Sequence, residues 1–237
     1  MSDFVIENGT LIRYTGSNTD VVIPEMIDNI KVTKIGEKTF YWNNSITSIK
    51  LPSSITEIEY GTFWGCGSLK SITLPSNLTS IGESAFLGCK SLKSIELPNS
   101  VAFIGNSAFE RCTSLASIKI PNGVKAIEKW TFKDCTSLTS IELPNTITAI
   151  GYGAFYNCKS LESIVLPSGL TTIGMSAFEC CKSLKSIEIP SSVSDIGLWT
   201  FESCPSLTIF AQAEKQPEEW AENWNTNKRP VIWNYKK

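Results

Sequence analysis

The chain of 237 residues contains no histidine, no long apolar run and no basic run. Without histidine, the commonest general base and the commonest metal ligand are missing. No apolar stretch approaches the roughly 20 residues of a membrane-spanning helix, so we expect no membrane insertion. The net charge of −2, from 21 basic and 23 acidic residues, argues against nucleic acid or an anionic membrane as a partner.

The sequence also lacks the other parts from which active sites are built. It contains no Cys-x-x-Cys pair, no phosphate-binding glycine loop and no recurring pair of acidic residues. These absences predict a protein that is not an enzyme and that carries no metal and no cofactor.

The N-terminus lacks the basic and apolar regions of a secretory signal. Two explanations stay open: the protein stays inside the cell, or a signal has been removed and replaced by a start codon. The sequence does not choose between a cytoplasmic and a secreted or surface location.

What the chain does contain is a repeat of 23 residues, shown by the spacing of Cys89 and Cys112 (112 − 89 = 23). The cysteine column of this repeat is Cys66, Cys89, Cys112, Cys135, Cys158, Cys181 and Cys204, and the phenylalanine column is Phe63, Phe86, Phe109, Phe132, Phe155, Phe178 and Phe201. A fixed period of this size predicts a solenoid, in which each repeat buries its apolar side chains against its neighbours.

Seven of the eight cysteines lie in this one column, beside apolar columns. We therefore predict buried, reduced thiols rather than disulfides, because free cysteine behaves as a small hydrophobic side chain. Asn43 takes the same position in the first repeat, which suggests a small side chain that also meets a backbone group. Cys180 lies outside the column and is the cysteine we expect to be the most reactive.

One repeat predicts two short strands and a turn. Ser94–Leu97 alternates polar and apolar residues, so we expect a strand with Ile95 and Leu97 inward, ended by Pro98. Val101 and Ile104 favour a second short strand, although their spacing also suits a helix. Residues 106–110 then form a tight turn or a single helical turn. A glycine such as Gly105 follows in most repeats, where a positive φ would be convenient.

The two ends of the chain depart from the period and are predicted to cap the solenoid. Residues 1–30 form an N-terminal β-hairpin cap with an Asn8-Gly9 turn, and residues 28–32 carry an extra loop. The solenoid of about eight repeats covers residues 31–210. A Trp-rich cap covers residues 211–237, with a short helix at 216–224 and a strand at 229–235. Trp220 and Trp224 are expected to plug the core rather than to contact a ligand.

The full motif, Cys-x-x-Leu-x-x-Ile-x-Leu-Pro-x-x-Val-x-x-Ile-Gly-x-x-Ala-Phe, resembles the BspA-type leucine-rich repeat over residues 35–210. The resemblance implies a β-rich, right-handed leucine-rich-repeat rod with two short strands and a tight or helical turn per repeat. It also implies a bacterial surface or secreted protein that binds host matrix proteins or other cells. The motif departs from the general leucine-rich pattern, because its cysteine precedes the strand.

Specificity belongs in the columns that vary between repeats. Lys119 lies between Glu96 and Glu142 on neighbouring strands, which favours a solvated ladder of surface ion pairs over a binding site. The turn columns hold large aromatic side chains that the repeat does not require: Tyr60, Trp64, Trp130, Tyr152, Tyr156 and Trp199. We predict these residues as candidate partner-binding residues, because Tyr and Trp anchor many interfaces. The alternative is that they cover the edge of the core.

Two hypotheses for function follow. The first is a non-catalytic module that binds a protein or a glycan, in adhesion or another interaction at the cell surface. The alternative is a structural or scaffolding repeat protein inside the cell.

Overall fold

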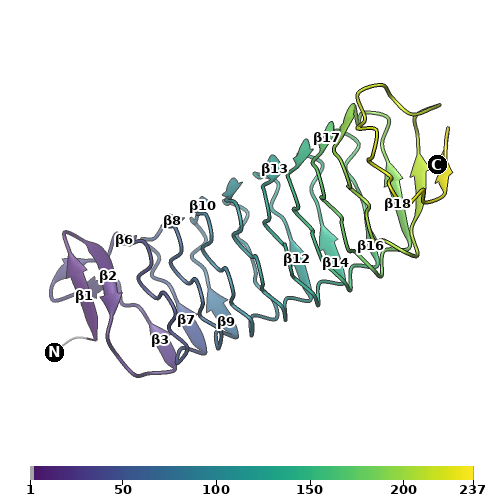
Figure 1. Ribbon diagram of the computed structural model, residues 1–237. Helices are drawn as coiled ribbons and strands as arrows, with labels where there is room; N and C mark the ends of the chain where they lie inside the picture. Colours follow the sequence, from purple (N-terminus) through teal and green to yellow (C-terminus); the bar gives the residue numbers. More distant parts are fainter. Residues whose placement is uncertain (1–2, 237) are drawn as a thin grey trace.

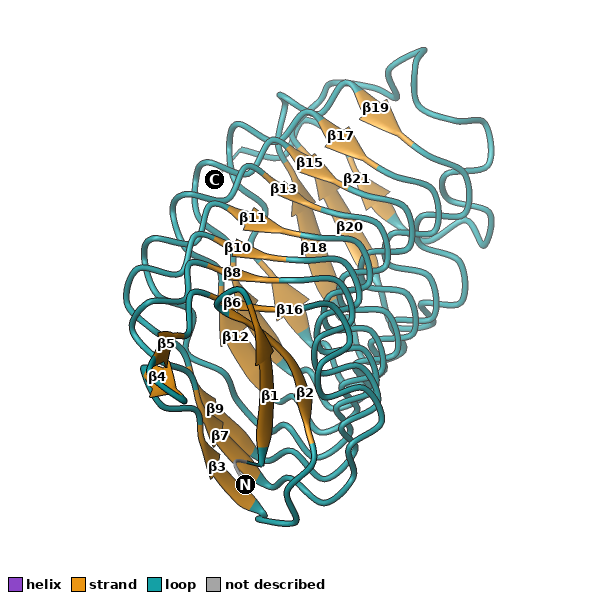
Figure 2. Ribbon diagram, turned by 90° about the vertical axis from the view of Figure 1, so that its left-hand side faces the viewer, coloured by secondary structure: helices purple, strands orange, loops and turns teal. Residues whose placement is uncertain are grey.

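The computed structural model describes residues 3–236, and these form one elongated solenoid with the two chain ends at opposite ends of the rod (Figure 1). Each repeat contributes a first strand, a second shorter strand and a series of turns, which together make three sides of the rod. We call these sides the first sheet face, the second sheet face and the turn face. Figure 2 shows the second strands in one row, with the turns stacked beside them. The predicted repeat solenoid is confirmed.

The first sheet face consists of parallel strands related by the repeat. They are β3 (Asp20–Val22), β7 (Ser48–Lys50), β9 (Ser71–Thr73), β12 (Ser117–Lys119), β14 (Ser140–Glu142), β16 (Ser163–Ile164), β18 (Ser186–Ile189), β20 (Thr208–Ala211) and β21 (Val231–Ile232). Their inward side chains are buried, as Ile118 and Ile141 show.

The second sheet face is a row of strands of two residues each, also parallel. They are β6 (Lys34–Ile35), β8 (Glu57–Ile58), β10 (Ser80–Ile81), β11 (Phe103–Ile104), β13 (Ala126–Ile127), β15 (Ala149–Ile150), β17 (Thr172–Ile173) and β19 (Asp195–Ile196). The strand interpretation of Val101 and Ile104 is therefore correct for Ile104, while Val101 is buried just before the strand.

The first sheet face is not continuous, and one strand prediction is wrong. Its strands form three separate sheets, β3-β7-β9, β12-β14 and β16-β18-β20-β21. Residues 94–97 are not a strand, although Ile95 is buried as expected. A cavity of about 220 Å³ lies between Ile95–Leu97 and the next repeat at Lys119–Pro121. Residues 94–97 belong to no sheet, so the ladder of the first sheet face is interrupted here.

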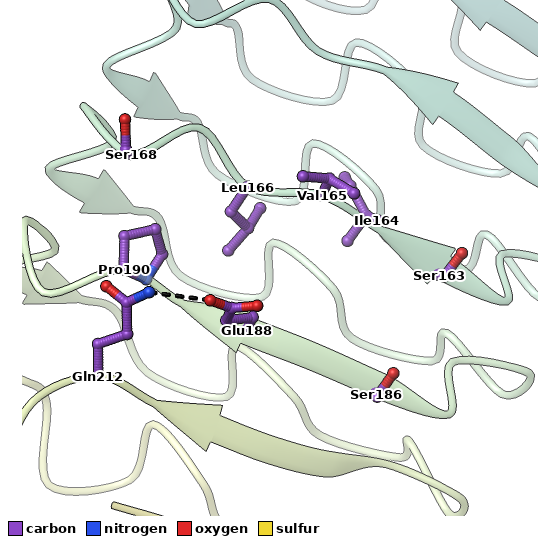
Figure 3. A pocket seen from close by; sticks show the side chains of 9 residues that line it. All are labelled: Ser163, Ile164, Val165, Leu166, Ser168, Ser186, Glu188, Pro190 and Gln212. Atoms are coloured by element: carbon purple, nitrogen blue, oxygen red, sulfur yellow. Dashed lines mark hydrogen bonds between the residues drawn. The ribbon is translucent and has the colours of Figure 1, made fainter. Parts of the chain in front are cut away.

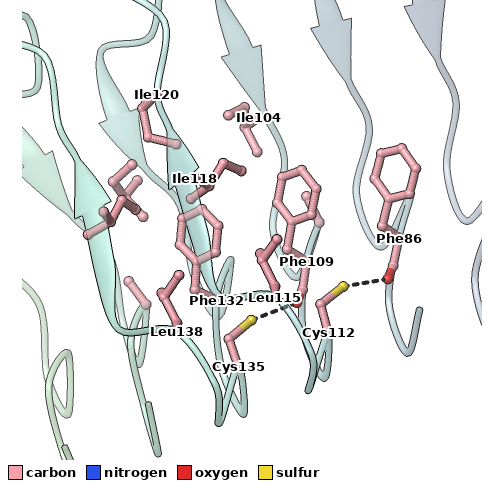
Figure 4. Close-up of a cluster of buried hydrophobic side chains, with 14 of the residues drawn as sticks. Phe86, Ile104, Phe109, Cys112, Leu115, Ile118, Ile120, Phe132, Cys135 and Leu138 are labelled. Carbon is pink, nitrogen blue, oxygen red and sulfur yellow. Dashed lines mark hydrogen bonds between the residues drawn. The ribbon is translucent and has the colours of Figure 1, made fainter. Parts of the chain in front are cut away.

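The core is a set of stacked columns that run the length of the rod. The phenylalanine rings of neighbouring repeats stack nearly parallel, as Phe86 and Phe109 do with centroids 5.4 Å apart (Figure 4). The stack begins at Phe40 and ends at Phe201. Parallel, offset rings at this spacing contribute about 0.5–1.5 kcal/mol per pair beyond their burial.

The cysteine column confirms the prediction of buried, reduced thiols. All eight cysteines are free, and the seven in the column are buried. Each of the seven donates a hydrogen bond to a phenylalanine carbonyl of the preceding repeat, as Cys112 Sγ does to Phe86 O at 3.2 Å (Figure 4). Asn43 meets backbone groups too, because its Oδ1 accepts from the amides of Ser45 and Ile46.

The N-terminal end contains the predicted hairpin. β1 (Phe4–Glu7) and β2 (Thr10–Tyr14) are antiparallel, and Asn8 and Gly9 both have positive φ, as a type I′ turn requires. β2 continues into the second sheet face by pairing with β6. The predicted extra loop is a second small hairpin of β4 (Met26–Ile27) and β5 (Ile30–Lys31). The division into caps and solenoid at residues 30 and 210 stays a prediction.

The C-terminal end differs from the prediction in one element. Residues 216–224 form turns, not a helix. The reason is that their backbone joins the ladder of the solenoid: Ala221 N donates to Ile196 O, and Asn223 O accepts from Trp199 N. Trp220 and Trp224 are nevertheless buried, with ring centroids 4.9 Å apart, and Trp224 covers the ring of Phe201. Within residues 3–236 we find no helix that could cross a membrane.

Candidate functional site

The turn face is built on a backbone geometry that recurs in every repeat. In every repeat but the last, three amides donate to carbonyls of the next repeat, as Ser84, Phe86 and Gly88 do to Asn106, Ala108 and Glu110. Two residues per repeat, four positions apart, have positive φ. The first position holds Lys38, Gly61, Ser84, Ser107, Trp130, Gly153, Ser176 and Trp199, and the second holds Trp42, Gly65, Gly88, Arg111, Asp134, Asn157, Cys180 and Ser203.

This geometry corrects our explanation of the glycine that follows the isoleucine. Gly105 does not have a positive φ; a Cβ there would lie 2.6 Å from the backbone nitrogen of Glu83 in the preceding repeat. Gly82 and Gly151 meet the preceding repeat equally closely. Close approach between repeats, and not a left-handed conformation, therefore favours glycine in this column, although Glu59 and Glu128 fill it in two repeats.

Trp130 and Trp199 are exceptions in a column that otherwise holds mostly glycine and serine. Their φ values are 57° and 56°. The left-handed conformation costs an L-residue roughly 1–2 kcal/mol, and a bulky residue there is an outlier. Both indoles are exposed, with 38% and 44% of their surface accessible. The protein thus places two large apolar side chains on its surface at positions that oppose them.

The two tryptophans stand at the ends of a trough on the turn face. Three repeats separate them, which corresponds to about 14 Å at roughly 4.8 Å per step of a parallel ladder. The small residues Gly153 and Ser176 lie between them in the same column. The hollow has a volume of about 430 Å³ and is lined by Trp130, Lys133, Tyr152, Gly153, Tyr156, Ser176, Glu179 and Trp199. Four of the six predicted partner-binding residues therefore meet at one site.

The near wall of the trough is fixed by Gly153. A Cβ at this residue would lie 2.8 Å from Cδ1 of Trp130, so the indole rests on the glycine backbone. The ring of Tyr152 packs against the same indole, with centroids 5.3 Å apart. The far indole, Trp199, makes no ring contact within the described residues.

A buried carboxylate, that of Glu110, holds the ammonium group of Lys133 beside Trp130. Glu110 is 8% exposed and accepts a hydrogen bond from Ser107 Oγ at 2.8 Å. Lys133 Nζ lies 3.1 Å from Glu110 Oε1 and 5.5 Å from the ring centroid of Trp130. Lys133 therefore forms an ion pair and a cation–π contact at once.

Tyr156 lies on the other side of the trough and is half-buried. Burial raises the pKa of its phenol, and the neighbouring Cys180 and Glu179 raise the pKa further. Tyr156 is thus a neutral hydrogen-bonding group at neutral pH, beside a half-buried carboxylate.

The remaining two predicted residues, Tyr60 and Trp64, belong to a separate aromatic cluster near the N-terminal end of the same face. The ring of Trp64 contacts the rings of Tyr41 and Tyr60, with centroids 5.3 and 6.2 Å away. Lys38 Nζ lies 5.1 Å from the ring centroid of Tyr60 and 5.8 Å from that of Tyr41. This cluster is packed on itself around its own cation, which is the alternative that we considered for the aromatic residues.

A second hollow of about 380 Å³ lies on the first sheet face between β16 and the C-terminal cap (Figure 3). Val165 stands at this hollow with 77% of its surface exposed, and Gln212 Nε2 donates to Glu188 Oε1 at 2.8 Å. On the same face Lys119 pairs with Glu142 at 3.4 Å, and both side chains are largely exposed. The predicted solvated surface pair is confirmed for Glu142; no pair of Lys119 with Glu96 forms within the described residues.

Sequence reasoning missed Lys133, Ser176 and Glu179 as members of the trough, together with the role of Gly153. The signal was present in the alternation of glycine and serine with tryptophan in one column. Residues 3–236 contain no group of three acidic or cysteine side chains placed to hold a metal ion. The trough presents aromatic faces, hydroxyls, the ammonium group of Lys133 and the carboxylate of Glu179.

Comparison with known proteins agrees with this architecture. The model of the BspA type leucine rich repeat region matches six copies, over residues 13–139 and 125–217. A leucine-rich repeat protein of T. pallidum shares 32% identity and a TM-score of 0.59, over 84% of this chain and 82% of that chain. A leucine rich cell surface protein from Faecalibacterium prausnitzii shares 24% identity and a TM-score of 0.46, over 99% and 93% of the two chains. No curated protein matches the sequence.

Proposed function

The chain belongs to the BspA-type leucine-rich repeat family, and we propose that it is a non-catalytic module that recognises a macromolecular partner through the trough between Trp130 and Trp199. The observation that carries this proposal is the backbone conformation of the two tryptophans. Glycine or serine fills the same column in the repeats between them.

The turn needs a residue with positive φ in this column, and glycine or serine supplies it in most repeats, so the turn itself does not explain why two indoles stand there. Residues in sparsely populated backbone conformations concentrate where a binding site needs a particular side chain in a particular place. An exposed indole also offers a flat apolar face with a hydrogen-bond donor, which suits both protein and glycan partners. The strain at Trp130 and Trp199 therefore supports a role in binding.

The partner is a protein or a glycan, and the setting is adhesion or another interaction at the cell surface. The trough is open along the rod, so it suits an extended segment rather than a small enclosed ligand. About 14 Å between the tryptophans corresponds to roughly four residues of an extended chain. Fractionation of native cells tests the setting, since a protein found only in the cytoplasm would favour the scaffolding alternative.

The experiment compares binding of the unaltered protein and a Trp130→Gly/Trp199→Gly variant to matrix proteins, bacterial cells and a glycan array. We expect the variant to lose at least tenfold in affinity for whichever partner the unaltered protein binds, because both platforms are gone. Trp42→Gly is the matched control, since Trp42 is also exposed and also has positive φ, but lies at the other aromatic cluster. Loss of binding in the control alone would place the site there and contradict the proposal.

A further inference from the structure

The arrangement around Trp130 contains its own cation, Lys133, and so shows where on the turn face a cation is bound. Ser107, Glu110, Trp130 and Lys133 form one unit: Ser107 Oγ donates to Glu110, Glu110 pairs with Lys133, and Lys133 Nζ lies over the indole. The ammonium group is held 3.1 Å from the carboxylate and 5.5 Å from the ring centroid. Both contacts favour a positive charge at this point.

The same unit recurs three repeats later with one member changed. Adding three periods of 23 residues to Ser107, Glu110 and Trp130 gives Ser176, Glu179 and Trp199. The same step takes Lys133 to position 202, where the residue is Glu202. The serine, the carboxylate and the indole are therefore repeated, while the cation is replaced by a second carboxylate.

This second unit has no positive charge of its own. Glu179 and Glu202 occupy the same column in adjacent repeats and are both half-buried. Neither forms an ion pair within residues 3–236, and no lysine or arginine there lies over the ring of Trp199. Both carboxylates lie in turns of adjacent repeats, and like charges repel each other, so the unit is destabilised until a cation arrives.

We infer that the unit formed by Glu179, Trp199 and Glu202 binds the ammonium or guanidinium group of a lysine or arginine side chain from a partner polypeptide. That group takes the place that Lys133 Nζ takes beside Trp130, between a carboxylate and an indole face. The partner is a polypeptide because the trough continues for about 14 Å from this unit and can hold an extended backbone. This inference rests on the proposed function and names the ligand class of the same site.

The test uses short peptides with a single charged residue, acetyl-Gly-Ser-Lys-Ser-Gly-amide and its arginine and norleucine counterparts. Binding is followed by titration of the indole signals in NMR spectra of the whole protein. We expect the lysine and arginine peptides to bind at least tenfold more tightly than the norleucine peptide, because only they carry the cation. We also expect the affinity to fall as salt is raised from about 20 to about 500 mM, since the ion pairs are partly exposed.

Two substitutions use the internal repeat as a guide. Glu202→Lys supplies the missing cation from within the chain and should lower affinity for the lysine peptide at least tenfold while the fold is retained. Glu96→Lys is the matched control: it makes the same change in charge at an exposed position of the first sheet face, and it should leave the affinity unchanged. Glu179→Gln keeps the shape of the side chain and should also weaken binding.

Three results would overturn the inference: equal binding of the norleucine peptide, equal loss in the Glu202→Lys and Glu96→Lys variants, or binding of n-butylamine as tight as that of the lysine peptide. The proposed function fails separately. If a partner such as a neutral glycan binds in a way that depends on Trp199 but not on Glu202, the proposed recognition function stands and the inference of a cation-binding unit fails.

Discussion

Each cysteine of the buried column both fills space in the core and donates a hydrogen bond to the backbone. The thiol fills a space beside the phenylalanine stack, and it donates to a carbonyl oxygen of the preceding repeat. Burial raises the pKa of Cys66, Cys112 and Cys204 to about 12 from an ordinary value of 9.0. These thiols are therefore neutral and unreactive at neutral pH.

The first prediction concerns thiol reactivity. Native protein treated with iodoacetamide near neutral pH should be modified at Cys180 alone, because Cys180 is the one cysteine with partial exposure. Peptide mass spectrometry locates the modified residue, and a Cys180→Ser variant should take up no label until it is unfolded in urea. Labelling of the column in folded protein would show that the repeats open far more readily than their packing implies.

The second prediction is a loss of stability in alkaline solution. The folded protein holds the protons of the buried thiols to higher pH than the unfolded chain does. The contribution of the buried thiols to the free energy of unfolding is therefore fully present below pH about 9 and is lost as pH rises toward 12. Above pH about 9, each such thiol lowers the free energy of unfolding by about 1.4 kcal/mol per pH unit.

The measurement is the free energy of unfolding in urea at a series of pH values from about 8 to about 10, which spans the ordinary thiol pKa. The Cys112→Ala variant serves as the control, because its curve should be less steep by the share of one thiol. A free energy of unfolding that stays constant across this range would contradict the burial of the column.

At the scale of single residues, the sequence was informative where a side chain serves the repeat. The burial of the cysteines and of Trp220 and Trp224 followed from columns and from the position of the ends. The trough could be predicted only in part, since Tyr152, Tyr156 and Trp199 were recognised while Ser176 and Glu179 were not. Their role depends on which neighbours the turn brings beside them, and the spacing of one repeat does not contain that information.

At the scale of the element, the turn face depends on hydrogen bonds between repeats rather than within one. This explains both the tight turn at residues 106–110 and the missing helix at 216–224. Local patterns such as proline followed by acids favour a helix, but amides here have a carbonyl of the adjacent repeat within reach. Sequence patterns report only local conformational preference, so they do not predict these hydrogen bonds between the turns of neighbouring repeats. The interruption of the first sheet face at residues 94–97 was equally invisible, because that repeat has the same motif as its neighbours.

The third prediction separates the two kinds of glycine on the turn face. Gly105→Ala should destabilise the fold by up to about 3 kcal/mol, because the new Cβ would meet the backbone of Glu83 and the repeats would have to move apart. Gly88→Ala should cost only about 1 kcal/mol, since its φ is +73° but a Cβ there would come no closer than 3.8 Å to the backbone of Gly65. Urea denaturation of both variants gives the comparison, and a larger loss for Gly88→Ala would mean that the left-handed conformation dominates.

At the scale of the whole molecule, the rod is one continuous core closed by different residues at its two ends. Tyr14 and Phe4 cover the stack at the N-terminal end, and Trp224, Trp220 and Trp233 cover it at the C-terminal end. The fixed period made this architecture predictable, because every repeat must bury the same columns. The columns that the core does not fix, such as the one that holds Lys133 and Glu202, vary between repeats, and the proposed recognition site lies in them.

The molecule therefore holds two populations of tryptophan, one that closes the core and one that faces solvent in strained conformations. Trp224 is 3% exposed and its ring packs against those of Phe201, Trp220 and Trp233, whereas Trp199 is 44% exposed and packs against no other ring within the described residues. Loss of a buried tryptophan side chain costs about 3–5 kcal/mol. Replacement of Trp199 by glycine removes the packing of a half-exposed indole but also relieves roughly 1–2 kcal/mol of backbone strain.

The most direct test of this account is to measure the free energy of unfolding and partner binding together for Trp199→Gly and Trp224→Ala. We predict that Trp199→Gly changes the free energy of unfolding by less than about 1 kcal/mol, because the relief of backbone strain nearly offsets the missing burial of the indole. The same variant should lose at least tenfold in affinity, while Trp224→Ala should lose about 3–5 kcal/mol of stability. A Trp199→Gly variant that is as unstable as Trp224→Ala, or that binds its partner undiminished, would contradict a recognition role for the trough.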